Sequence, residues 1–244
     1  MEMLVKEKNI MTSCMYPMSI EVIDEIKRCQ EIQKEIKESG LDDVVLSWTG
    51  MFLHSVYHIF KDIREQNDGR KWNNSILFCG LSSQAMQLDW LIYSMYCGQY
   101  DLGLRELRNM LESAFLFYRG DYDIKFRNST LEQKAEELEK LKKQRMCGKE
   151  IFKNSGYVEW KKAYKLYGEL SGYIHMEISL DNAKRLFEDF NAYSCPIYEK
   201  ERVLECIHYI EKVIVMECNL MESILKEVYE IEDTNFASIF KGEE

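Results

Sequence analysis

A chain of 244 residues that is 46% hydrophobic and 30% charged has the composition of an ordinary folded protein, which excludes an intrinsically disordered one. Its formal charge of −10 repels polyanions at long range, so broad non-specific binding to nucleic acid is disfavoured. Because the chain holds only 2 prolines and 12 glycines, it has few obligatory breaks, and this favours long helices over many short strands.

Apolar residues recur every three or four positions along most of the chain, which is the spacing of amphipathic helices. Helices are predicted at about 19–38, 43–66, 73–97, 101–118, 131–145, 157–176, 180–190 and 198–231. Ser39 and Gly40 are predicted to end the first of these, since glycine is the usual residue just past a helix end.

Short connections between these helices imply antiparallel neighbours. The predicted fold class is therefore all-α, a mainly up-and-down antiparallel bundle of about seven or eight helices with a peripheral charged helix at 131–145.

The domain prediction consists of an irregular arm at 1–17, a single helical-bundle domain at 18–235 with a peripheral insertion at 119–156, and an acidic tail at 236–244. Within the insertion, 119–130 is expected to be the longest irregular connection. Gly148 and Gly156 are expected to lie in a second loop.

The helix predicted at 101–118 carries charged residues beside its apolar stripe rather than opposite it. The ridge consists of Arg105, Arg108, Glu112 and Arg119. Because apolar residues follow again on the far side of this ridge, the helix is expected to be interior and its charges at least partly buried. A buried charge must be paired, and Arg108 and Glu112, four positions apart, can pair with each other.

The stretch YGELSGYIHM, residues 167–176, offers polar groups that complement this ridge. Tyr167, Ser171 and His175 follow one another at intervals of four, so they lie along one edge of a helix. Gly168 and Gly172 lie on the neighbouring strip, where the lack of side chains lets a backbone or a ligand approach, against a helix-propensity cost of roughly 1 kcal/mol per glycine. The sequence predicts one buried polar site between the two helices, and a purely structural network without a ligand is the open alternative.

The segments YDLGLRELRNMLESAFLFY and YGELSGYIH together resemble an uncharacterised group of prokaryotic, largely archaeal, all-helical proteins. Their shared pattern joins an Arg-x3-Glu helix to a later Tyr-x2-Leu-Ser-x-Tyr-x-His helix, and the likeness covers about residues 75–180. That group in turn resembles abortive-infection and HEPN-type helical domains, some of which cleave RNA.

The resemblance to HEPN ribonucleases implies a role for His175 as general acid or base. These enzymes place an arginine shortly before the histidine, where this sequence has Gly168, Glu169 and Leu170. Arg108 would therefore have to supply the missing cation as the phosphate-binding group. A free histidine pKa near 6.5 suits transfer of the 2′-hydroxyl proton.

His54 and His58 lie one helical turn apart, with Asp62 a further turn on, and could hold a zinc or iron ion. The helical projection places both histidines opposite the apolar stripe, so two solvent-facing histidines are the favoured interpretation. His208 lies among apolar residues of the last helix and is interpreted as a core histidine.

The 8 cysteines are scattered without a CxxC motif, which argues against a metal cluster or a disulfide framework. The N-terminal stretch lacks the apolar core of a signal peptide, and the apolar run at 76–97 is interrupted by Gln84, Gln87 and Asp89. These features predict a reduced, cytoplasmic protein.

The basic residues between Lys140 and Lys153 follow a run of glutamates and are interpreted as a solvated helix end.

The sequence favours a scaffold, regulatory or small-anion-binding protein and leaves open whether it is an enzyme. The alternatives are a HEPN-like ribonuclease or nucleotide-processing enzyme, and a metal-dependent helical-bundle enzyme. The candidate residues are His175 and Glu112 for catalysis, Arg105, Arg108, Tyr167 and Ser171 for ligand binding, and, as weak candidates for a metal, His54 and His58. No cofactor is expected. Self-association, a small anion and RNA stay open as partners, whereas DNA and a membrane are not expected.

Overall fold

The computed structural model describes residue 24 and residues 26–66, 74–143, 148–173 and 198–230. These residues form helices and turns, and the described part contains no strand, so the all-α prediction is confirmed. Its labelled helices are α2 (Leu41–Gln66), α3 (Ile76–Tyr96), α4 (Tyr100–Tyr122), α5 (Ile124–Arg127), α6 (Leu131–Lys143), α7 (Gly148–Lys153), α8 (Trp160–Ser171) and α10 (Lys200–Tyr229). A further helical stretch covers 26–38.

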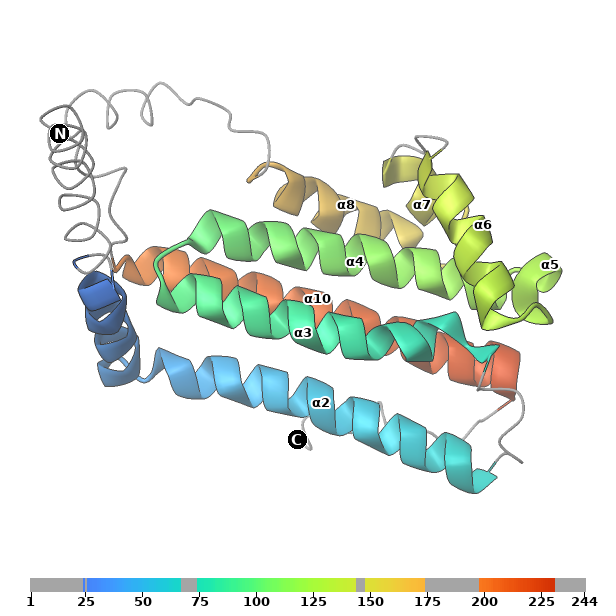
Figure 1. Cartoon of the computed structure of the whole chain (residues 1–244), viewed down its shortest axis with the longest axis horizontal. Coiled ribbons are helices and arrows are strands. Elements are labelled where there is room, and N and C mark those ends of the chain that lie inside the picture. The colour runs from blue at the N-terminus through green and yellow to red at the C-terminus, as the bar shows by residue number, and fades with distance from the viewer. Residues whose placement is uncertain (1–23, 25, 67–73, 144–147, 174–197, 231–244) are drawn as a thin grey trace, which may run out of the picture.

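The long helices α2, α3, α4 and α10 lie side by side along the longest axis of the molecule, and α8 lies along α4 (Figure 1). Consecutive helices α2, α3 and α4 alternate in direction, as short connections require. Helix α4 packs against α3, α10 and α8. It therefore has apolar residues on most of its faces, and Leu104, Leu107 and Leu111 are fully buried in it.

Local signals place the helix ends. Gly40 has φ +70° and ends the stretch at 26–38, as the sequence predicts. The side chain of Ser75 accepts a hydrogen bond from the Phe78 backbone N–H, which caps the start of α3. Thr130 and Gln133 bond each other's backbone N–H groups at 3.0 and 3.3 Å, a capping box that starts α6 at Leu131.

The expectation that 119–130 is an irregular connection is wrong. Helix α4 continues to Tyr122 because the buried stripe that includes Tyr118 extends one more turn to Asp121. Asp123 then caps α5 by accepting from the Lys125 backbone N–H. The loop expected around Gly148 likewise contains the helix α7, which buries Ile151 and Phe152.

Helix α6 crosses the end of α4 at the margin of the molecule (Figure 1). It is peripheral in position, as predicted, yet one of its faces is buried, since Leu138 and Lys134 are 7% and 3% exposed. The arm predicted at 1–17, the helix predicted at 180–190 and the tail predicted at 236–244 lie outside the described residues. Among the helices that the structure does describe, none combines the length and the apolar character that a membrane span requires.

Candidate functional site

The seam between α4 and α8 brings together four of the residues that the sequence singles out. Arg108 Nε donates to Ser171 Oγ at 3.0 Å, and Arg108 Nη2 donates to the Tyr167 hydroxyl. The Tyr167 hydroxyl in turn donates to Glu112 Oε2 at 3.4 Å. Ser171 is itself fixed, because its hydroxyl donates to the Tyr167 carbonyl at 2.7 Å. The result is one continuous polar network that joins two helices far apart in the sequence.

Arg108 and Glu112 form an ion pair with an N–O distance of 3.7 Å, and their side chains are 21% and 28% exposed. The site is therefore partly buried and open to water on one side, rather than enclosed as the sequence predicts. The reason is that α8 is short and covers α4 along one flank only.

Tyr167 is the residue that holds the site in place. The Arg108 guanidinium carbon lies 4.4 Å from the centre of its ring, within the range of a cation–π contact. Burial, and then the Glu112 carboxylate, raise the pKa of the Tyr167 phenol, while Arg108 opposes the shift. The phenol is thus a neutral hydrogen-bonding group at physiological pH.

Helix α7 supports the far side of the Tyr167 ring. A Cβ added at Gly148 would lie 2.6 Å from a Tyr167 ring carbon, so glycine is required there for the close approach. The Phe152 ring lies 5.1 Å from the Tyr167 ring, and Tyr164 stacks beside it at 6.2 Å. This aromatic packing fixes the ring and leaves its hydroxyl pointing to α4.

Arg105 lies one turn before Arg108 on α4. Its Nε is buried and has no hydrogen-bond partner in the described part of the chain. Residues three apart on a helix are neighbours on its surface. Two guanidinium groups, one held by Ser171 and Tyr167 and one without a bonded partner for its Nε, therefore emerge from adjacent positions.

Among the described residues, no other segment approaches Gly168 or Gly172, so the close approach of a backbone predicted there is not seen, and the approach of a ligand stays a prediction. Gly168 is exposed, and a Cβ added there would meet nothing within 4 Å. At Gly172 the only atom near such a Cβ is the Glu169 carbonyl oxygen of the same helix, at 3.3 Å.

His175 lies outside the described residues, so the ribonuclease expectation stays a prediction. Helix α8 ends at Ser171 rather than near Met176. Tyr173, the last described residue of this segment, donates its hydroxyl to Glu205 of α10. Burial and this hydrogen bond raise the pKa of the Tyr173 phenol.

The weak metal candidates lie on α2. His54 is exposed, as the sequence predicts, and its ring centre lies 4.2 Å from that of His58. No group of three or more histidine, cysteine, aspartate or glutamate side chains in the described residues is arranged to hold a metal ion. His208, interpreted as a core histidine, is instead exposed beside Tyr209, because it lies on the outer face of α10.

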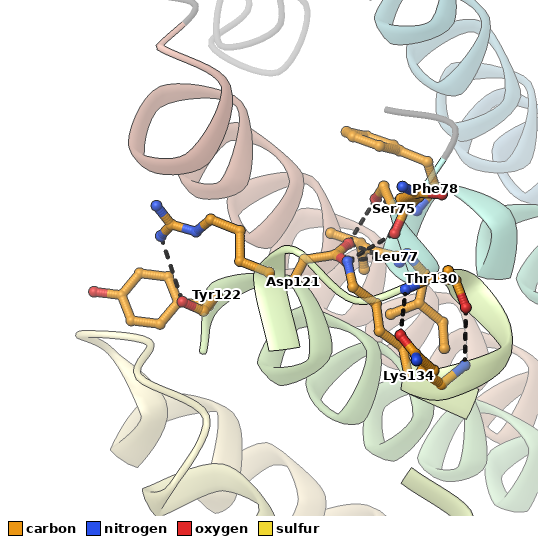
Figure 2. A network of polar contacts seen from close by, with 11 residues as sticks. Ser75, Leu77, Phe78, Asp121, Tyr122, Thr130 and Lys134 are labelled. Atoms are coloured by element: carbon orange, nitrogen blue, oxygen red, sulfur yellow. Dashed lines mark hydrogen bonds and ion pairs between the residues drawn. The ribbon is translucent and has the colours of Figure 1, made fainter. Parts of the chain in front are cut away.

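A second polar network, which the sequence interpretation missed, joins α3, α4 and α6 (Figure 2). Asp121 at the end of α4 accepts from the backbone N–H groups of Ile76 and Leu77 at 3.0 Å and from Ser75 Oγ at 2.5 Å. Lys134 Nζ donates to Asp121 at 2.8 Å and to the Asn74 carbonyl at 2.7 Å. The exposed fractions of the Lys134 and Asp121 side chains are 3% and 1%.

The helical pattern of the sequence could have predicted this ion pair, because both residues occupy positions of the buried stripes. Asp121 follows Tyr118 at the interval that continues the apolar stripe of α4. Lys134 takes the apolar position between Leu131 and Leu138 on α6. Two opposite charges at core positions of neighbouring helices predict a buried ion pair. Its place at the start of α3, where free N–H groups attract an anion, makes it structural.

Comparisons of this chain with protein-family models, with curated proteins and with solved structures found no match. The interpretation of the α4–α8 seam therefore depends on its own geometry.

Proposed function

We propose that the protein is a helical scaffold or regulatory protein that binds a small oxyanion, such as a carboxylate or phosphate group, at the α4–α8 seam. The observation that carries the proposal is the pair of guanidinium groups of Arg105 and Arg108, which are adjacent on α4 and incompletely hydrogen-bonded by the described residues. Arginine presents five N–H donors in a planar fork that matches the oxygens of such anions.

The hydrogen bonds to Arg108 supply preorganisation. Ser171 and Tyr167 engage Nε and Nη2, so the plane of the guanidinium is fixed before a ligand arrives. Nη1 donates to no residue in the part of the chain that is described. A donor group that is already oriented loses less conformational entropy on binding than a free arginine would.

Glu112 is the group that an incoming anion has to replace. Its carboxylate lies 3.7 Å from Arg108 Nη2 and 3.4 Å from the Tyr167 hydroxyl, both longer than a strong charge-assisted hydrogen bond. Binding of a ligand oxygen at a shorter distance would strengthen these contacts. Repulsion by Glu112 would at the same time favour ligands of low charge.

The test is a titration with inorganic phosphate and with acetate at constant ionic strength, followed by calorimetry and by thermal unfolding. One of these anions should raise the unfolding temperature of the wild-type protein, since a ligand at 100 times its Kd adds about 2.7 kcal/mol of stability. The effect should be lost in Arg105→Gln, because the buried Nε of Arg105 has no hydrogen-bond partner among the described residues that the substitution would disturb.

Lys161→Gln is the matched control. It removes one exposed positive charge from α8, the helix that forms the other side of the seam. It should bind as the wild type does. Equal binding by Arg105→Gln and the wild type, or no binding of either anion by the wild type, would remove the proposal. Arg108→Lys keeps the charge without the fork and should bind more weakly than the wild type.

A further inference from the structure

A carboxyl group that pairs with no cation of the described residues lies in the core of the bundle. Glu217 on α10 is 1% exposed, and Gln84 on α3 is also 1% exposed. Gln84 Nε2 donates to Glu217 Oε1 at 3.2 Å, and this is the hydrogen bond that joins the two side chains. Burying an ionised carboxylate with a single neutral hydrogen bond would be strongly unfavourable.

The second oxygen of each side chain shows how the hydrogen bonding of the pair can be completed. Glu217 Oε2 and Gln84 Oε1 are both buried, and neither has a hydrogen-bond partner among the described residues. Both oxygens are acceptors when the glutamate is ionised, so they cannot satisfy each other. One proton on Glu217 Oε2 turns that oxygen into a donor, and Gln84 Oε1 is an acceptor on the side chain that already bonds Oε1.

From this geometry we infer that the core of the bundle contains a proton-binding site, in which Glu217 is a neutral carboxylic acid that makes two reciprocal hydrogen bonds with the Gln84 amide. The acid donates through Oε2 to Gln84 Oε1, and the amide donates through Nε2 to Glu217 Oε1. The ring of two bonds joins α3 to α10 and leaves no polar atom of either side chain without a partner. Loss of the proton removes one bond and puts a charge in an apolar interior.

The surroundings of Glu217 favour the neutral form. Burial is the cause that raises the pKa of the Glu217 carboxyl well above its usual range. On α3, Gln84 lies between Leu81 and Leu88, which are 1% and 2% exposed. The next residue of α10, Cys218, is a buried thiol whose pKa is raised by burial.

The helices that pack against α10 also present few charges to its buried face. Among the α2 side chains that the structure describes, none of the buried ones is charged. The buried ionisable groups of α4 are Tyr100, which accepts from the Glu199 backbone N–H, Tyr118, bonded to Ser223, and Asp121, paired with Lys134. On α3, Asp89 is exposed, and α8 meets α10 through the partly exposed pair of Glu169 and Lys212. Each of these groups is hydrogen-bonded, ion-paired or exposed to solvent, and none is paired with Glu217 among the described residues.

The sign of the pH dependence follows from the raised pKa. The unfolded chain releases this proton near pH 4.3, and the folded protein keeps it to higher pH. The contribution to stability is complete below the unfolded pKa and is lost as the pH rises through the folded one. Between the two values, the folding equilibrium constant should fall about tenfold per pH unit relative to a variant that cannot ionise.

The experiment compares the wild type with Glu217→Gln, which keeps the shape and both hydrogen bonds but has no proton to lose. Urea unfolding is measured at intervals from pH 5 to pH 9. Glu217→Gln should become progressively more stable than the wild type as the pH rises. Glu211→Gln, which removes an exposed carboxylate from the same helix, is the control and should follow the wild type.

A direct measurement of protonation makes the test independent of how the variant folds. In wild-type protein labelled with carbon-13 at glutamate carboxyls, one signal should still report the acid form after the other glutamates have ionised. That signal should be missing from the Glu217→Gln spectrum. Ordinary titration of every glutamate carboxyl, or parallel pH–stability curves for the wild type and Glu217→Gln, would overturn the inference.

Discussion

Tyr167 connects the two charged residues of the α4–α8 seam through one hydroxyl, so its removal tests the seam at the scale of a single residue. Tyr167→Phe keeps the ring under Arg108 and removes the hydrogen bonds to Arg108 and Glu112. Because the seam is partly exposed, we expect the free energy of unfolding to fall by about 1.5 kcal/mol, the lower end for hydrogen bonds to charged groups. Urea unfolding monitored by circular dichroism measures the loss.

The matched control is Tyr164→Phe, one turn earlier on α8, whose hydroxyl makes no hydrogen bond with the described residues. This variant should change the unfolding free energy by less than about 0.5 kcal/mol. If the two variants lose the same free energy, the hydroxyl of Tyr167 adds nothing to the seam, and preorganisation of Arg108 has to be abandoned.

Two glycines in helix interiors should respond in opposite ways to alanine. No atom of the described residues lies within 4 Å of a Cβ at Gly168, so Gly168→Ala should raise the unfolding free energy by about 0.5–1 kcal/mol through helix propensity. A Cβ at Gly80 would overlap the Phe117 ring of α4, so Gly80→Ala should lower stability. Thermal unfolding of both variants provides the measurement. A loss of stability in Gly168→Ala would instead support the prediction that a backbone or a ligand approaches α8 closely at this glycine.

At this scale the sequence predicts which residues meet but not how deeply they lie. The phase of Arg108, Glu112, Tyr167 and Ser171 follows from helical periodicity, and these four do come together. Their exposure depends on the length of α8 and on which flank of α4 it covers. Those quantities arise from packing between helices, and a single helix pattern does not contain them.

Among the secondary-structure elements, α6 depends most on one interaction. Lys134→Met leaves the Asp121 carboxylate buried without its cation at the start of α3. Removing one partner of a buried ion pair typically lowers the unfolding free energy by about 3–5 kcal/mol, so we expect a loss of that order. Urea unfolding at neutral pH measures it.

Two further variants show whether the loss comes from the unpaired charge. Lys140→Met removes an exposed lysine of the same helix, paired with Glu137, and should cost less than about 0.5 kcal/mol. Lys134→Met combined with Asp121→Asn removes the charge but keeps an oxygen for the α3 N–H groups, so it should recover part of the loss. A double variant that is less stable than Lys134→Met would argue against an electrostatic origin.

Helix boundaries show where periodicity is informative and where it is not. Gly40 ends the stretch at 26–38 as predicted, because glycine is a strong local signal for a helix end. The extension of α4 to Tyr122 was missed because a buried charge, Asp121, occupies an apolar position of the stripe. Sequence patterns assign charged residues to the surface, and a paired charge in the core contradicts that rule.

For the molecule as a whole, the arrangement predicts two levels of stability. Helix α4 packs against both α3 and α10, and these three helices contribute most of the buried apolar side chains. Helix α6 packs through one face only, at the margin of the molecule. In native-state hydrogen exchange, the slowest amides should therefore lie in α4 and α10 and exchange only through global unfolding. Those of α6 should exchange through local opening at a lower free energy.

The variant Lys134→Met tests how strongly the stability of α6 is coupled to that of the central helices. It should speed exchange in α6 and in the first turn of α3, because Asp121 and Lys134 hold both. The local free energy of opening in the middle of α10 should fall only by the global loss of stability. If α6 in the wild type were as protected as α10, the molecule would unfold as one unit, and the insertion would have to be counted as part of the core.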